Sequence, residues 1–495
     1  MKFEERIRRM RGAGVPLIAI ETEDQPNTVA KILAIANGKT PVCQWDLARG
    51  LIGVNKEGMT VADTVNGGKK PAIATGNPSE MLKAIYDTDN TIVIMLNGHR
   101  FMDNPSVTQG VCNLREKFKQ SRSTLAMLCP GITLPAELRQ DVMIVNDPLP
   151  TVEEVGVIVK EICEAAEITN VVDADRISDT LIGLSAFSSE QTLSTCVYLK
   201  DDKTVDIDRE SLWDTKCKVI AQTPGLSILD TNESFEELDG CDNIINFLKK
   251  FQDKYRVVTL VDEIDKAFSA ANTDTSGTTQ DQHSAWLTWM QDKEVDGIIC
   301  IGVPGSGKSA VVKAAAKHYG CVGVGYDFGA MKSKFVGESG QQTRQGLRII
   351  DAVGQGKVLV IATCNNIAVL PTELRRRFTL GTFFFDSPTD RARQGIWKIY
   401  EKKYGVSGEH PEDVGWTGAE IKQCCKLASR TGTSLVEASR YIVPVTVSAK
   451  DQIDQLRTQA SGKFTSAAKS GVYVKDEVEY LPKKKRQMNL KDIES

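Results

Sequence analysis

The stretch that most constrains this chain is a glycine-rich run between an apolar segment and a helical pattern. Residues 298–301 read Ile-Ile-Cys-Ile, and residues 302–309 read Gly-Val-Pro-Gly-Ser-Gly-Lys-Ser. The spacing G-x-x-x-x-G-K-S is typical of a loop that cradles phosphate between a strand and a helix. Glycines let backbone N–H groups turn toward one phosphate, and the following helix start adds partial positive charge. We therefore expect a nucleotide phosphate site in this loop.

Each residue type in this pattern has a defined task. Lys308 is expected to reach the β- and γ-phosphates, and Ser309 is expected to ligate Mg²⁺. The predicted nucleotide-binding run comprises Gly302, Val303, Pro304, Gly305, Ser306, Gly307, Lys308, Ser309 and Ala310.

Two further apolar runs end in polar side chains that suit hydrolysis of a phosphoanhydride. The run 257–261 leads directly into Asp262 and Glu263, which is the Walker B arrangement. Asp262 is expected to help hold Mg²⁺, and Glu263 to polarise the attacking water. The run 357–364 ends at Asn365, which is placed to orient a water near the γ-phosphate.

Composition and charge limit the class of protein. The chain has 495 residues, enough for two or three domains, and 41% of them are hydrophobic. The net charge of −4 does not favour binding of the whole chain to nucleic acid or to an anionic membrane. No apolar run approaches the roughly 20 residues that span a bilayer, so no membrane partner is expected.

The cysteines and histidines do not suggest a metal site or a disulfide framework. Twelve cysteines are scattered without paired metal spacing, and four histidines stand isolated. The charged N-terminus lacks the apolar core of a secretory signal. We expect reduced thiols in a cytosol-like compartment.

Strand and helix patterns divide the chain into four parts. Residues 1–150 predict an α/β domain without a nucleotide site, because Thr22-Glu-Asp-Gln follows its first strand instead of a phosphate loop. Residues 151–237 predict a helical region and linker, with helices over 152–166, 176–198 and 210–223. Residues 238–388 predict the nucleotide-binding core, and residues 389–495 a helical C-terminal part with a basic tail. Continuous apolar strands between helices predict parallel sheets covered on both faces.

These motifs together resemble those of the AAA+ ATPases. The resemblance rests on Gly302–Ser309, Asp262-Glu263, the run 362–365 and the arginines 375–377. It implies a P-loop α/β core with a helical lid, ATP and Mg²⁺ as cofactors, and a homo-hexameric ring. It also implies that Arg376 or Arg377 acts across the subunit interface.

Two other segments resemble parts of the classic AAA clade. Residues 416–420, Trp-Thr-Gly-Ala-Glu, are similar to its sensor 2 helix start, which implies nucleotide contacts from Gly418 and Ala419. Residues 334–339 resemble a pore loop, which implies that Lys334, Phe335 and Val336 grip a protein substrate.

A narrower resemblance covers most of the chain. Segments 16–18, 44–51, 130–138, 147–150, 262–268 and 286–289 resemble the conserved open-reading-frame AAA family of cyanobacteria and plastids. In that family a degenerate N-terminal AAA-like domain precedes one active module. The resemblance implies a cytoplasmic or plastid stromal protein, or one of an equivalent reducing compartment.

The order of the motifs departs from that family pattern. Asp262 and Glu263 precede the P-loop, whereas the Walker B strand normally follows it. Three interpretations stay open: a permuted core whose strand ends still converge, an artificial or misassembled chain, or carboxylates that do not reach the nucleotide.

Three functions follow from these features. The first is an ATP-hydrolysing ring that remodels or threads a protein substrate or acts with an adaptor. The second is a nucleic-acid motor or loader, for which only residues 6–11 and 483–486 offer basic clusters. The third is an assembly switch that binds ATP without hydrolysing it.

Overall fold

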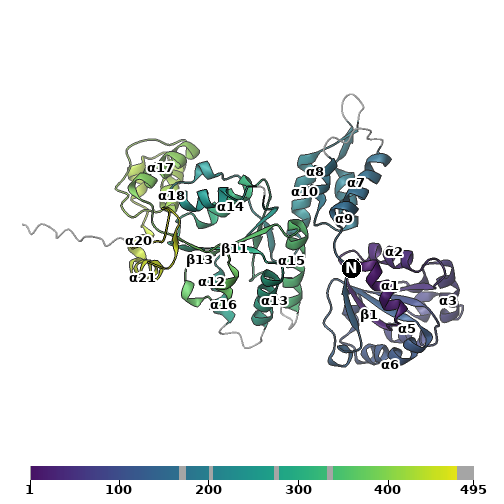
Figure 1. Cartoon of the computed structure of the whole chain (residues 1–495). Coiled ribbons are helices and arrows are strands. Elements are labelled where there is room, and N and C mark those ends of the chain that lie inside the picture. The colour runs from purple at the N-terminus through teal and green to yellow at the C-terminus, as the bar shows by residue number, and fades with distance from the viewer. Residues whose placement is uncertain are drawn as a thin grey trace, which may run out of the picture.

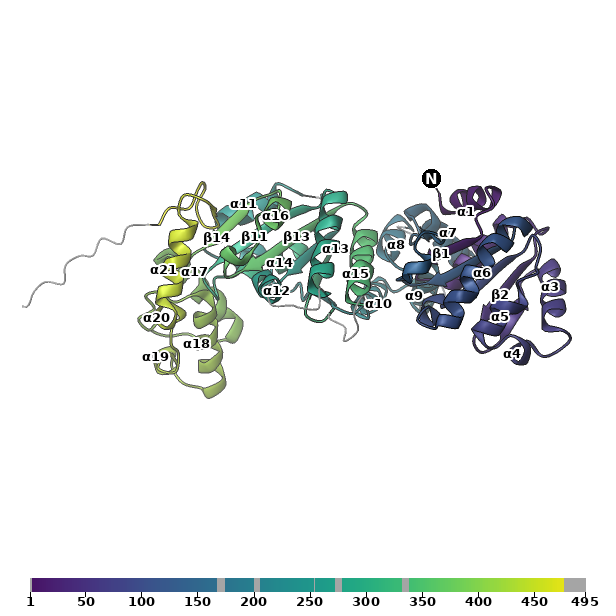
Figure 2. The same cartoon turned by 90° about the horizontal axis from the view of Figure 1, so that it is seen from below.

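The chain builds two parallel-rich sheets joined by a helical region. The computed structural model describes residues 2–166, 174–199, 205–252, 254–271, 278–331 and 338–475. Figure 1 shows the two sheet domains at opposite ends of the helices α7 to α10, and Figure 2 shows the same arrangement from below. The predicted α/β fold with a P-loop core and helical C-terminal part is confirmed.

The first sheet has the order β3-β2-β4-β5-β1-β6, and its pairs are parallel except for the β2–β3 hairpin. Alternate residues of β1 face opposite sides, since Leu17 and Ala19 join one apolar cluster and Ile18 and Ile20 the other. Its strands are β1 (Leu17–Glu21), β2 (Val42–Asp46), β3 (Gly50–Gly53), β4 (Ile92–Leu96), β5 (Thr124–Cys129) and β6 (Met143–Asn146). The helices are α1 (Phe3–Gly12), α2 (Gln25–Ile35), α3 (Lys56–Asn66), α4 (Pro71–Ala74), α5 (Pro78–Ala84) and α6 (Pro105–Ser121).

A helical region with its own apolar cluster follows the first sheet. It consists of α7 (Val152–Ala165), α8 (Ala174–Leu181), α9 (Ala186–Thr195), the hairpin β7 (Val197–Leu199) and β8 (Val205–Ile207), and α10 (Arg209–Ala221). The predicted helix over 176–198 is wrong, because α8 ends at Leu181. Gly183 then takes φ +91°, a left-handed conformation, and the Ser185 side chain caps the start of α9.

The second sheet has the order β15-β14-β11-β13-β10-β12-β9, and β10 lies between β13 and β12. All its pairs are parallel except β12–β9. Its strands are β9 (Leu226–Ile228), β10 (Val257–Val261), β11 (Asp296–Gly302), β12 (Val322–Tyr326), β13 (Val358–Cys364), β14 (Thr382–Phe385) and β15 (Thr465–Ser466). β9 and β15 lie in segments predicted as linker and helical tail, yet both pair with strands of this sheet.

The two sheets share one spatial arrangement despite different chain orders. Reading from β6 to β2 in the first sheet and from β14 to β12 in the second gives five matching parallel positions. In this correspondence β10 occupies the position of β4, and β11 that of β1. Although β10 comes before β11 in the chain, it therefore lies where β4, which comes after β1, lies in the first sheet.

Helices cover both faces of the second sheet and extend beyond one end. α11 (Asp242–Lys249) and α14 (Lys308–His318) pack on one face. On the other are α12 (Ile264–Ala271), α13 (Thr278–Asp292), α15 (Glu338–Gly354) and α16 (Thr372–Arg377). The C-terminal part comprises α17 (Asp390–Tyr404), α18 (Gly418–Thr431), α19 (Leu435–Ser439), α20 (Val445–Ser448) and α21 (Lys450–Ala460). Within the described residues, no helix combines the length and apolarity that a membrane crossing requires.

Candidate active site

The glycine-rich loop joins β11 to α14 in a conformation that requires its glycines. Gly305 has φ +80°, and a Cβ there would lie 2.6 Å from Thr417 Oγ1 and 2.8 Å from Ala419 Cβ. Gly307 has φ +92° and caps the start of α14. The loop therefore needs both the left-handed backbone and the missing side chain, as a close-fitting phosphate cradle does.

Lys308 lies folded back against the loop. Its Nζ donates hydrogen bonds to Gly302 O at 2.9 Å and to Val303 O at 3.0 Å. Only 8% of the residue is exposed, and this burial lowers its pKa to about 8. Asp262 and Asp265 attract this ammonium only enough to offset part of the effect of burial, so an incoming phosphate would further stabilise its charged form.

The displaced carboxylates reach the P-loop. Ser309 Oγ lies 3.1 Å from Asp262 Oδ1, and the Thr363 hydroxyl also bonds to Asp262 Oδ1. The backbone N–H of Glu263 donates to Thr363 Oγ1 at 2.9 Å. These contacts join the ends of β10 and β13 to the start of α14. This geometry favours the permuted core over the interpretation in which the carboxylates do not reach the nucleotide.

Glu263 and Asn365 line the same cavity with distinct surroundings. Glu263 adopts φ +49°, and its carboxylate pairs with Lys266 one helical turn later. The Asn365 N–H donates to Asp265 Oδ1 at 3.2 Å. Its side-chain Oδ1 is buried and has no hydrogen-bond partner among the described residues. A buried acceptor without a partner suits a water or ligand donor in the cavity.

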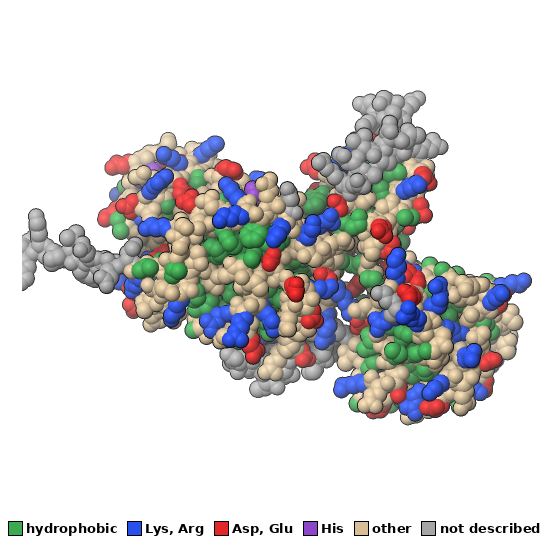
Figure 3. Space-filling model, in the orientation of Figure 1, with side chains coloured by type: hydrophobic (Ala, Val, Ile, Leu, Met, Phe, Trp, Pro, Cys, Tyr) green, Lys and Arg blue, Asp and Glu red, His purple; other side chains and the backbone are tan. Residues whose placement is uncertain are grey.

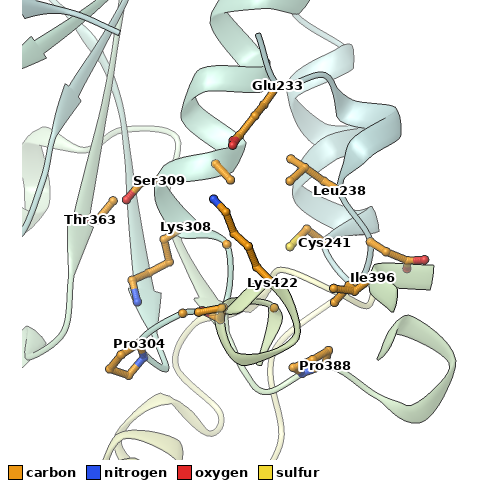
Figure 4. A pocket seen from close by; sticks show the side chains of 18 of the residues that line it. Glu233, Leu238, Cys241, Pro304, Lys308, Ser309, Thr363, Pro388, Ile396 and Lys422 are labelled. Atoms are coloured by element: carbon orange, nitrogen blue, oxygen red, sulfur yellow. The ribbon is translucent and has the colours of Figure 1, made fainter. Parts of the chain in front are cut away.

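The cavity has a volume of about 380 Å³ and lies between the sheet edge and the C-terminal helices. Figure 4 shows Ser309, Lys308 and Thr363 on one side and Leu238, Cys241 and Ile396 on the other. Lys422 extends into it from α18. A charged end beside an apolar end matches the two halves of a nucleotide, phosphates and base.

Most predicted residues meet at this cavity. The run 304–310 lines it together with Gly418 and Ala419 of α18. Gly302 and Val303 do not line it, but their carbonyls hold Lys308. The sequence prediction missed Glu233, Leu238, Gly240, Cys241, Ile396, Tyr400 and Lys422. These lie on segments before β10 and after β14 whose local patterns carry no ligand signal.

Two groups of predicted residues stand apart. Arg376 and Arg377 lie on α16 and do not line the cavity. Arg376 is exposed, whereas Arg377 is half-buried and its Nε has no partner in the described structure. Lys334, Phe335 and Val336 lie outside the described residues.

The donor set fits Mg²⁺ held jointly with phosphate. The described residues contain no cluster of three or more His, Cys, Asp or Glu side chains able to hold a metal alone. Asp262 and Ser309 instead offer one carboxylate and one hydroxyl. Magnesium in such sites takes one or two carboxylates and completes its shell with phosphates and water.

Comparisons with known proteins show which family this chain resembles. Residues 3–146 match the family model "SpoVK-like AAA ATPase, N-terminal domain". An uncharacterized AAA domain-containing protein ycf46 of Trieres chinensis is 22% identical over 481 residues, covering 86% of this chain and 88% of that protein. The ycf46 protein of Guillardia theta is 20% identical over 535 residues, covering 94% and 97%. That of Gracilaria tenuistipitata var. liui is 22% identical over 408 residues, covering 74% and 76%. The predicted resemblance to this AAA family is confirmed.

Proposed function

Because the chain belongs to the AAA ATPases, we propose that it binds Mg-ATP and hydrolyses it at the cavity beside Lys308. The observation that carries this proposal is the 3.1 Å contact between Ser309 Oγ and Asp262 Oδ1. It brings the displaced acidic pair to the residue that follows the P-loop lysine. A site assembled in this way has the phosphate cradle, the metal ligands and the base within one cavity.

Each side chain has a role that its position supports. Lys308 leaves the carbonyls of Gly302 and Val303 to contact the phosphates. Ser309 and Asp262 would hold Mg²⁺, which would neutralise charge on the phosphate oxygens. Glu263 separates from Lys266 and accepts the proton of the attacking water, while Asn365 Oδ1 accepts a hydrogen bond from that water.

The test compares ATP binding with ATP turnover. Lys308→Ala should lose binding, whereas Glu263→Gln should keep binding and lose at least about a hundredfold in turnover, as removal of a general base does. Glu409→Gln, which changes an exposed acid that does not line the cavity, serves as the matched control. Wild-type turnover in Glu263→Gln would exclude it as the base. Tight binding without turnover in the wild type would indicate the assembly switch instead.

We further propose a homo-hexameric ring that acts on a protein substrate or through an adaptor. Arg376 supports this idea because it is exposed and away from its own chain's cavity, as a residue acting on a neighbour must be. Lys334, Phe335 and Val336 are proposed to grip the substrate. Twelve free thiols suit the cytoplasm, a plastid stroma or another reducing compartment.

Mixed assemblies test the ring. Arg376→Ala or Arg377→Ala subunits, combined with Lys308→Ala subunits, should change ATPase activity in a ratio-dependent way. If the mixtures show at every ratio no more than the summed activity of the two variants measured separately, arginines acting in trans are excluded. In the view of Figure 3, Lys and Arg side chains are mixed with Asp and Glu side chains over most of the visible face, which gives no support to a nucleic-acid motor. Binding to DNA or RNA with a steep salt dependence would revive that function.

A further inference from the structure

The first α/β domain has a crevice at the sheet edge that corresponds to the nucleotide cavity of the second. In the second domain the P-loop follows β11 and contacts the start of α18. In the first domain Thr22, Glu23 and Asp24 follow β1, and Asp24 Oδ2 accepts a hydrogen bond from the Phe187 N–H of α9 at 3.0 Å. Both edges are therefore closed by a helix start from the helical region that follows in the chain.

At this edge of the first domain, side chains of α2 pair with an acid that follows β6. Thr28 Oγ1 donates to Asp147 Oδ2 at 2.6 Å, and Lys31 Nζ lies 2.8 Å from Asp147 Oδ1. Asp147 supplies the negative charge that a phosphate would otherwise bring to Lys31. The crevice is thus satisfied internally and has no need of a nucleotide.

Helix α15 of the second domain packs against this crevice. Arg348 forms an ion pair with Glu21, and its Nη1 donates to Pro130 O at 3.4 Å. Gln345 Nε2 donates to Glu23 Oε2 at 3.1 Å. Figures 1 and 2 both show α15 between α13 and the helices α8 and α10. Residues more than 200 positions apart therefore meet along one helix.

The helical region touches α15 as well. Gly183 approaches so closely that a Cβ would lie 2.2 Å from Val353 Cγ2. A cavity of about 610 Å³ and another of about 250 Å³ flank the helix, and both are lined by Glu23, Leu149 and Ile349. Solvent can thus reach the polar contacts from two sides.

The first α/β domain and the helical region that follows it contact the second domain in different ways. Ile220 of α10 and Leu226 of β9 are buried in the apolar core of the second domain. The α/β domain, in contrast, contacts α15 through the polar groups of Glu21 and Glu23. Pro148, Leu149 and Pro150 connect the two parts. Because apolar packing is lost only at large cost while polar surface contacts exchange readily with water, the α/β domain is the part that can move.

We propose that α15 docks onto the first α/β domain at the carboxyl ends of its strands. This docking limits the movement of the ATPase core during turnover. α15 ends at Gly354 and leads through residues 355–357 into β13, which carries Thr363 and Asn365 at the active site. Movement of β13 during turnover must then strain the Arg348–Glu21 pair or break it. The effect on turnover rests on the proposed ATPase function, whereas the docking itself does not.

Arg348→Ala removes the central contact and leaves the active site intact. In the full chain we expect ATP turnover to rise about two- to fivefold, as loss of one partly exposed ion pair would allow. Amide hydrogen exchange should increase over 20–24, 184–188 and 344–349. Arg115→Ala is the matched control, because it removes an arginine paired with Asp141 inside the same α/β domain.

Glu21→Gln tests the same contact from the other side if Arg348→Ala folds poorly, and the exchange Glu21→Arg with Arg348→Glu should restore wild-type values. Unchanged or lower turnover in both single variants would overturn the restraint, and unchanged hydrogen exchange would overturn the docking. If the wild type hydrolyses no ATP, the proposed function fails, and hydrogen exchange still decides whether α15 is docked.

Discussion

Raising the pH from 7 to 9 should weaken ATP binding about tenfold through the deprotonation of Lys308. Burial lowers the pKa of this ammonium to about 8 in the nucleotide-free protein. Its charged fraction then falls from about nine-tenths at pH 7 to about one-tenth at pH 9. The difference corresponds to about 1.4 kcal/mol of binding free energy.

The direction of the pH effect follows from comparing the pKa of Lys308 in the nucleotide-free and the nucleotide-bound protein. Bound phosphate places negative charge beside Nζ and raises its pKa above that of the free protein. The affinity for ATP is therefore highest at pH values well below 8, and it declines as the pH rises through 8. The decline ends only where the bound lysine loses its own proton. Phosphate ionisation contributes little in this range, since its last pKa lies near 6.

The dissociation constant is measured by titrating the protein with a fluorescent ATP analogue, in the presence of Mg²⁺, at pH 7, 8 and 9. Lys308→Arg is the matched control, because a guanidinium stays protonated throughout. Its affinity should be lower overall but nearly constant with pH. A constant affinity in the wild type, or the same tenfold decline in Lys308→Arg, would refute the reasoning.

Three other perturbations test separate parts of the structure. Gly305→Ala should abolish nucleotide binding while circular dichroism stays native, because the new Cβ has no space beside α18 and the backbone has φ +80°. Thr363→Val should lower ATP turnover about tenfold or more with little change in stability, since it frees Asp262 from a hydrogen bond that positions it; an unchanged turnover number would contradict this. Asp386→Asn should destabilise the chain by about 1–3 kcal/mol in urea unfolding, because Asp386 pairs with Arg457 at 2.8 Å and fixes the C-terminal segment to the sheet; an unchanged midpoint would show that this pair contributes nothing.

Local sequence patterns were sufficient to predict those strands and helices whose formation depends on neighbouring residues in the chain. Continuous apolar strands predicted both sheets, and the part predicted as helical, residues 389–495, contains α17 and α18. The helix prediction over 176–198 was wrong because the apolar spacing continued across Gly183, whose left-handed conformation ends the helix. β9 and β15 were missed because such short strands form only when a neighbouring strand edge is present.

The active site divides in the same way. The P-loop and the acidic pair were visible because each depends on consecutive residues with fixed chemistry. The apolar end of the cavity, with Leu238, Cys241 and Ile396, was not visible, because its residues come from separate segments that only folding brings together.

The sequence by itself determined the phosphate-loop pattern, the acidic pair and the absence of a phosphate-loop pattern after the first strand. These features follow from residue type and spacing, which the chain carries without folding. Only the tertiary structure decided that Asp262 reaches Ser309, since a parallel sheet aligns the carboxyl ends of its strands whatever their order in the chain. It also decided that α15 rests against the first domain, because that contact joins residues more than 300 positions apart that no local pattern connects.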